Sequence, residues 1–160
     1  MAVARELSAR DPDDPQALPD LVACLEKLAQ AHRAEGDLDT AIGAYREAVQ
    51  IARRLLETRN EEAQTLRDFS MSLMRLGHVY REAGVFEHAR DAYEEGLALD
   101  RRLLNIVGEL PQSLRDLETS LRHVAEIREQ LGDDAGAAAA RAERVAIGER
   151  LVSFEGPQEG

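Results

Sequence analysis

The stretch AHRAEGDLDTAIGAY, residues 31–45, indicates the fold because its arrangement returns in VYREAGVFEHARDAY, residues 79–93. In both stretches a Gly separates two segments that have apolar residues at helical spacing, and an Ala and a Tyr follow the Gly at the same distances. Glycine adopts positive φ at the least cost, which is what the end of a helix before a tight turn requires. Each stretch therefore predicts two helices joined by a short turn.

This arrangement repeats with a period of 48 residues, as the positions of Gly36, Gly84 and Gly132 show. The same shift brings similar residues together in many further columns, among them Leu25, Leu73 and Leu121; Leu28, Leu76 and Val124; Ala29, Gly77 and Ala125; Ala41, Ala89 and Ala137; and Cys24, Ser72 and Ser120. A fixed period of this size is typical of a solenoid, in which each unit buries its apolar face only by stacking on its neighbours.

The composition supports helices throughout. Hydrophobic residues make up 44% of the chain but aromatic residues only 4%, and Ala, Leu, Glu and Arg predominate, which favours helix over sheet. We expect an all-α solenoid of three helix-turn-helix repeats in a right-handed superhelical stack, with helices of roughly 20 residues. Pro111 suits the first turn of a helix, whereas Pro19 predicts a kink or a restart in the first helix.

The expected organisation is a single repeat domain over residues 1–155, followed by a frayed tail. Residues 3–7 align with the end of a second helix under the same shift, which predicts a partial helix before the first complete repeat. A short native cap and the end of a longer array both remain open for this segment. The predicted parts are the partial helix 2–10, repeat one 15–58, repeat two 62–106, repeat three 111–153 and the tail 156–160.

The second unit resembles the tetratricopeptide repeat family at Leu73, Leu76, Gly77, Tyr80, Gly84, Phe86, Ala89 and Tyr93. The usual repeat of this family has about 34 residues, so the 48-residue unit is similar to the long-helix variant of kinesin-light-chain-like and bacterial repeat proteins. The third unit departs from the pattern at Arg128, Asp134, Arg141 and Arg144. Such polar residues suit a terminal repeat, which needs a polar outer face.

Charge and cysteine content exclude several classes of function. The net charge is -11, from 20 basic and 31 acidic residues, which argues against non-specific binding to nucleic acid or to an anionic membrane. No apolar segment approaches the ~20 residues that a membrane span needs. Cys24 is the only cysteine, so an intramolecular disulfide is impossible. With no signal-peptide pattern at the N-terminus, we predict a cytoplasmic protein.

The sequence carries no motif that predicts catalysis. The four histidines are His32, His78, His88 and His123, and no two of them stand at a metal-ligand spacing on one helix. The glycines do not form a phosphate-binding loop, and no G-x-S-x-G motif is present. We therefore expect neither an enzyme nor a cofactor-binding protein.

The family resemblance implies a partner protein or peptide in a concave groove lined by the first helix of each repeat. The residues expected to face this groove are Lys27, Gln30, Arg33, Arg67, Met71, Met74, Arg75, His78, Arg81, Arg122 and His123. Methionine adapts to varied apolar anchors, and arginine pairs with carboxylates, so the expected ligand is an acidic or amphipathic peptide or helix. The alternative is that the arginines pair with nearby Glu and Asp while the methionines only fill space between helices.

These observations predict a non-catalytic scaffold for protein–protein interaction. Two alternatives stay open: a regulatory or sensor module of a larger signalling or transcription-control protein, and a module that self-associates through its exposed terminal repeats. The family's site for acidic chaperone tails requires Lys and Asn where Glu26, Gln30 and Arg75 stand, so that ligand is not expected.

Overall fold

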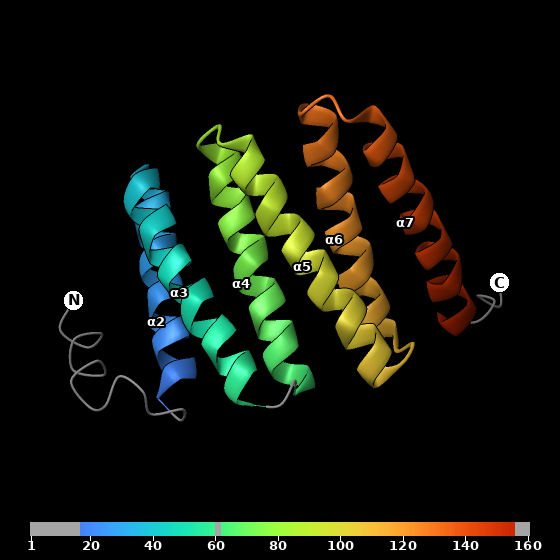
Figure 1. The fold of residues 1–160 in the computed structure, drawn as a ribbon, viewed down its shortest axis with the longest axis horizontal. Helices are drawn as coiled ribbons and strands as arrows, with labels where there is room; N and C mark the ends of the chain where they lie inside the picture. The colour runs from blue at the N-terminus through green and yellow to red at the C-terminus, as the bar shows by residue number, and fades with distance from the viewer. Residues whose placement is uncertain (1–16, 60–61, 156–160) are drawn as a thin grey trace.

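A computed structural model describes residues 17–59 and 62–155. This part of the chain forms six helices and no strand (Figure 1), which confirms the all-α prediction. The helices are α2 (Leu18–Ala34), α3 (Leu38–Thr58), α4 (Ala63–Glu82), α5 (Phe86–Val107), α6 (Pro111–Gln130) and α7 (Asp134–Glu155). The predicted partial helix 2–10 and the tail 156–160 lie outside the described residues.

Each helical hairpin turns at the glycine that the repeat predicted. Gly36, Gly84 and Gly132 have φ values of 81°, 76° and 77°. The residue after each glycine donates its backbone N–H to a carbonyl five positions earlier, as Asp37 does to His32 at 2.9 Å and Asp133 does to Arg128 at 2.8 Å. This bond closes the end of the first helix. The three turns therefore share one backbone geometry that a residue with a Cβ would adopt only under strain.

Prolines lie at the starts of two helices. Pro19 falls in the first turn of α2, where a missing N–H leaves no intrahelical bond unmade. Pro19 therefore lies at the start of α2 within the described residues. Pro111 is the first residue of α6, as predicted, and Ser113 Oγ accepts a hydrogen bond of 3.1 Å from the backbone N–H of Leu110.

The repeats are joined by a core that passes from each hairpin to the next. Helix α3 packs against both α2 and α4, α5 packs against both α4 and α6, and α7 packs against α6. Val49 of α3 lies in one buried cluster with Phe69 of α4, and Leu97 of α5 lies in another with Leu121 of α6. Because each second helix covers the first helix of the following hairpin, the three hairpins form the predicted solenoid.

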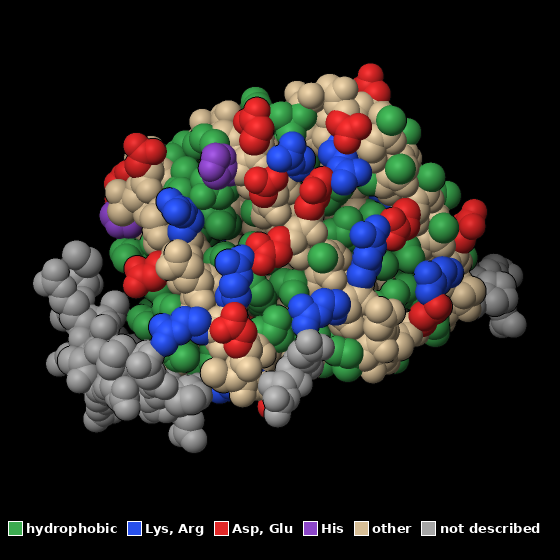
Figure 2. Space-filling model, viewed as in Figure 1, with side chains coloured by type: hydrophobic (Ala, Val, Ile, Leu, Met, Phe, Trp, Pro, Cys, Tyr) green, Lys and Arg blue, Asp and Glu red, His purple; other side chains and the backbone are tan. Residues whose placement is uncertain are grey.

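Ion pairs repeat with the same period as the core. Arg53 of α3 contacts Glu95 of α5 at 2.6 Å, and one period later Arg101 of α5 contacts Glu143 of α7 at 2.6 Å. Figure 2 shows acidic and basic side chains interspersed over the face in view. All four side chains are well exposed, so each pair contributes about 1 kcal/mol or less. The two pairs join equivalent positions of successive hairpins.

One buried carboxyl interrupts the apolar interface between repeats two and three. Asp100 of α5 is 3% exposed and accepts a hydrogen bond of 2.5 Å from Ser120 Oγ of α6. Burial raises the pKa of this carboxyl, while hydrogen bonds from Ser120 and Ser70 act against the rise. The equivalent residue of the first repeat is Ala52, so the repeat pattern did not predict this polar contact.

Candidate functional site

The side chains of α2, α4 and α6 that point away from the second helices form one surface, which we call the first-helix face. Ion pairs connect its three helices. Arg33 of α2 contacts Glu82 of α4 at 2.6 Å, and Arg81 of α4 contacts Glu126 of α6 at 2.9 Å. A further pair joins Arg67 and Asp116 at 3.2 Å, and another joins Arg75 and Glu26. Ion pairs between successive repeats therefore connect the three helices of this face.

These pairs change the expected electrostatics of the groove. The five arginines of the predicted groove each have an acidic partner: Arg33, Arg67, Arg75 and Arg81 have the partners just given, and Arg122 contacts Glu126 at 3.5 Å. Lys27 and Gln30 are exposed on α2. The positive charge of the arginines is thus largely compensated within the face, as the alternative interpretation of the sequence expected.

A hollow of about 360 Å³ is lined by residues of α2 and α4 and also by Ala52 and Leu55 of α3. We call it the Met71 cleft. Its apolar lining includes Val22 and Met71 and the nearly fully buried Leu55 and Phe69, with Glu26 and Arg75 among its polar residues. The Met71 side chain is 46% exposed, so it is available for contact. Met74, by contrast, is partly buried and packs against the core cluster of repeats two and three.

A polar network fixes one wall of the Met71 cleft. The carboxylate of Glu26 accepts a hydrogen bond of 2.7 Å from Ser72 Oγ and another from the guanidinium of Arg75. The side chain of Glu26 is only 14% exposed. Charge-assisted bonds of this kind are stronger and more directional than neutral ones, so they hold the wall in one geometry.

A second, more open depression lies near the hairpin turns of the first-helix face. Its volume is about 870 Å³, and it is lined by Arg33, His78, Arg81, Glu82, Phe86 and Gln130. Three of the predicted groove residues therefore meet here, whereas two others, Met71 and Arg75, meet in the Met71 cleft. Five of the eleven predicted groove residues thus line two hollows that share α4, and the other six line neither of them.

The histidines of the predicted groove lie in a small aromatic cluster around Tyr93. His123 is 5% exposed, and its ring stacks on that of Tyr93 with centroids 5.2 Å apart. His78 Nδ1 lies 2.9 Å from the hydroxyl of Tyr93. Burial lowers the pKa of His78, lowers the pKa of His123 to about 4 and raises the pKa of Tyr93 to about 12.

This cluster corrects the expectation for His123. The sequence placed His123 on the exposed groove, but the structure buries it between α5 and α6, because Tyr93 of the second repeat reaches across to the third. His78 is partly buried and lines the open depression while contacting Tyr93. Of the two histidines, only His78 therefore offers a surface to a ligand.

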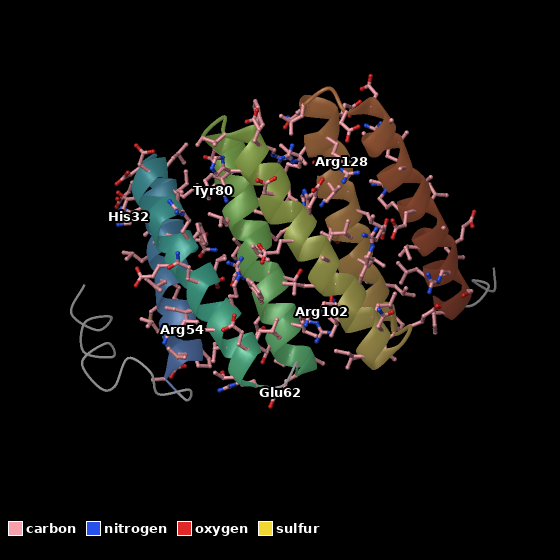
Figure 3. The ribbon with its side chains drawn as sticks, in the orientation of Figure 1. His32, Arg54, Glu62, Tyr80, Arg102 and Arg128 are labelled. Carbon is pink, nitrogen blue, oxygen red and sulfur yellow. The ribbon has the colours of Figure 1, made fainter. Side chains whose placement is uncertain are left out.

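Arg128, at which the third repeat departs from the family pattern, forms ion pairs within the protein. Figure 3 marks Arg128 on α6 near the turn that leads into α7. Its guanidinium lies 2.7 Å from the Glu94 carboxylate of α5 and 3.8 Å from that of Asp133. Arg128 therefore ties the last hairpin to the preceding one at a position where the other repeats have an aromatic ring or a histidine.

The structure adds two negative findings for residues 17–59 and 62–155. No group of three His, Cys, Asp or Glu side chains in these ranges could hold a metal ion. No helix within them is both long and apolar enough to cross a membrane.

Sequence reasoning missed several residues of the Met71 cleft. Phe69 and Leu55 were not among the predicted groove residues, yet both line the cleft, where they are nearly fully buried. Asp116 and Glu82 were not considered, although they pair with arginines of the face. Their distance of 49 residues from these arginines, one residue more than the period, was a signal in the sequence that could have suggested them.

Comparisons with known proteins agree with this architecture. A sequence model of the tetratricopeptide repeat matches residues 21–102. The fold is similar to the crystal structure of BtubC (BKLC) from P. vanneervenii, with a TM-score of 0.65 and 27% identity over 94% of this chain and 53% of that one. The chain thus spans about half the length of BtubC. No curated protein sequence matches the chain significantly.

The fold also resembles the de novo designed helical repeat protein DHR64, with a TM-score of 0.57 and 20% identity over 86% of this chain and 69% of that one. This likeness concerns the arrangement of helices alone. The match over residues 21–102 covers half of the 160 residues and coincides with the hairpins that repeat the Gly36 turn. The chain is therefore a member of the tetratricopeptide repeat family.

Proposed function

We propose that the protein is a non-catalytic interaction scaffold that binds an amphipathic peptide or helix along its first-helix face. Tetratricopeptide repeats generally mediate protein–protein interaction. The observation that carries the proposal is the Met71 cleft, where a half-exposed methionine and neighbouring apolar side chains are bordered by charged residues held in fixed positions. A ligand that places an apolar side chain in the cleft would remove this surface from water.

The ion pairs of the face support one kind of ligand over another. Because Arg75 is paired with Glu26 and Arg67 with Asp116, a strongly acidic ligand would have to compete with carboxylates that are already in place. An amphipathic ligand needs no such exchange, since it can present one apolar side to Met71 and polar groups to the mixed charges around it. We therefore favour an amphipathic ligand over a purely acidic one.

The proposal is tested by selecting peptides from a random displayed library on the full chain and measuring their affinity by isothermal titration calorimetry. The first variant is Met71→Glu, which places a charge in the cleft at a side chain that is 46% exposed and should leave the fold intact. The matched control is Ile106→Glu on α5, a position of similar exposure, 50%, outside the first-helix face.

Peptides that bind as proposed carry apolar residues at helical spacing and lose at least tenfold in affinity with Met71→Glu, while Ile106→Glu leaves them unchanged. If all selected peptides bind the Met71→Glu variant as tightly as the unmodified chain, the proposed site is wrong. Circular dichroism of both variants confirms that the comparison is made between folded proteins.

A further inference from the structure

Helix α7 carries an apolar stripe that no described element covers. Ala138, Ala142, Val145 and Val152 are exposed, and the two valines have exposed fractions of 58% and 66%. Their spacing of four, three and seven residues places them along one side of the helix. Figure 1 shows α7 at the end of the row of hairpins, with α6 on its inner side. The stripe is therefore a candidate contact surface.

The repeat identifies this side of α7 as the one that other second helices use for contact. One period earlier, Val145 and Val152 correspond to Leu97 and Leu104 of α5, which pack in the core cluster that includes α6. Two periods earlier they correspond to Val49 and Leu56 of α3, which pack in the cluster that includes α4.

A further hairpin stacked in the same way would be a poor occupant of this surface. Arg141 stands where the second repeat has Tyr93, a ring that is 1% exposed within the stack. An identical stacking would remove the guanidinium of Arg141 from water, which is costly without a carboxylate placed to receive it. Arg101 of α5 forms an ion pair with Glu143 in the following hairpin. One period later, the equivalent residue of α7 is Glu149, so α7 could not form this ion pair with a further hairpin.

We propose that α7 pairs in antiparallel orientation with α7 of a second copy of this chain, about a two-fold axis that passes beside Val145. Residues at equal distances from Val145 then lie at the same height on the two helices. Arg141 meets Glu149 of the second copy, and by symmetry the opposite pair forms as well. Two complementary ion pairs thus flank a central contact between the two Val145 side chains.

The remaining residues of the stripe fit the same register. Ala138 lies at the height of Val152 of the second copy, and Ala142 lies at that of Gly148. Small residues allow two helix axes to approach closely, and alternation of small and large side chains fills the contact. Arg141 already contacts Glu129 within the chain, and its several N–H donors let it bind both carboxylates.

The size of this contact sets the expected affinity. Residues 138–152 span about 21 Å of helix at 1.5 Å per residue. A single helix pair of this length buries less than the ~1,200 Å² of stable protein interfaces. The dimer is therefore expected to be weak, and the concentrations in an experiment must reach the range of about 10 µM to about 1 mM.

Sedimentation equilibrium of the full chain over this range tests the proposal. The unmodified chain is expected to show a reversible equilibrium between monomer and dimer. Val145→Glu brings two like charges together at the axis and should weaken the dimer at least tenfold. Ile106→Glu introduces the same charge at a residue of similar exposure on α5, 50% against 58%, and should leave the equilibrium unchanged.

Charge reversal tests the register independently of apolar contact. Arg141→Glu and Glu149→Arg should each weaken the dimer, because like charges then face each other in both pairs. The double variant restores opposite charges and should recover the dimer. A chain that stays monomeric at about 1 mM, a dimer unaffected by Val145→Glu, or a double variant that recovers nothing would each overturn the proposal. The Met71 cleft plays no part in this contact, so the outcome is separate from that of the peptide-binding experiment.

Discussion

The imidazole ring of His123 lies parallel to the phenol ring of Tyr93, with an angle of 17° between the two planes. Tyr93 belongs to α5 and His123 to α6, so the stacked pair joins the second repeat to the third. The hydroxyl of the same tyrosine contacts His78 of α4. One ring therefore connects three helices through contacts that exclude water from an ionisable group.

The burial of His123 makes the stability of the protein depend on pH. Since its folded pKa is about 4, below the ordinary value of 6.5, the unfolded chain binds more protons between these values. The free energy of unfolding should therefore fall as pH drops from about 6.5 towards 4, by at most about 3 kcal/mol from this group. His78 shifts in the same direction, whereas Asp100 shifts in the opposite one.

The variant His123→Phe separates this contribution from the others. It keeps an aromatic ring against Tyr93 and removes the titrating group, so the slope of stability against pH between 4 and 6.5 should decrease. Urea unfolding followed by circular dichroism at several pH values measures the slope. His88→Gln, at an exposed position of α5, serves as the control. An unchanged slope in His123→Phe would show that the ring does not titrate as proposed.

The repeat pattern and the structure lead to opposite expectations for the stability of a Gly77→Ala variant. The equivalent residues Ala29 and Ala125 suggest that Gly77→Ala is harmless, and alanine favours helix by about 1 kcal/mol. In the structure, however, a Cβ on Gly77 would lie 2.5 Å from a carbon of the Tyr93 ring. That ring is held by its contacts with His78 and His123, so it has little freedom to move away.

We therefore expect Gly77→Ala to lower the free energy of unfolding by about 1 to 3 kcal/mol, the usual effect of overpacking a core. The matched control is Gly43→Ala in α3, where a Cβ would meet no atom within 4 Å; this change should stabilise by about 0.5 to 1 kcal/mol. Thermal and urea unfolding of both variants provide the measurement. A Gly77→Ala variant as stable as Gly43→Ala would contradict the close contact with Tyr93.

The buried carboxyl of Asp100 should lower the free energy of unfolding as pH rises. Its folded pKa is raised by burial, so the folded state binds more protons than the unfolded state and loses stability as pH rises through that pKa. Asp100→Asn keeps an acceptor for the Ser120 hydroxyl and removes the charge. The variant should gain about 1 kcal/mol or more at pH 7 and less at pH 4. A larger gain at pH 4 than at pH 7 would contradict the raised pKa.

Core packing, and not the ladder of surface ion pairs, should hold the repeats together. Arg101→Ala removes the pair with Glu143, and because both groups are exposed the loss should be about 1 kcal/mol or less. Leu103→Ala, two residues away, truncates a side chain that is 1% exposed and should cost about 2 to 5 kcal/mol. Unfolding in urea measures the free energy of unfolding of the two variants. Equal losses in the two would show that the ion pairs stabilise the stack of repeats as much as core packing does.

Much of the fold could be predicted from the sequence because its signals are local. The helices follow from apolar spacing within each unit, and the turns follow from Gly36, Gly84 and Gly132, whose positive φ the structure confirms. The stacking of hairpins also followed from the sequence, since a helix pair with two apolar sides must cover both. Pro111 marked a helix start for a reason that concerns only its own ring and its missing N–H.

The candidate site was predicted less well because it depends on how neighbouring helices are placed. The sequence indicated which helices form the face, but not that Arg75 binds Glu26 or that His123 lies under Tyr93. A helical pattern tells which side of a helix is apolar, whereas the partner of a long polar side chain depends on the distance and angle between two helices. The sequence alone thus determined the period, the helices and their turns, and the tertiary structure decided which charges are paired, which histidine is buried and where the cleft lies.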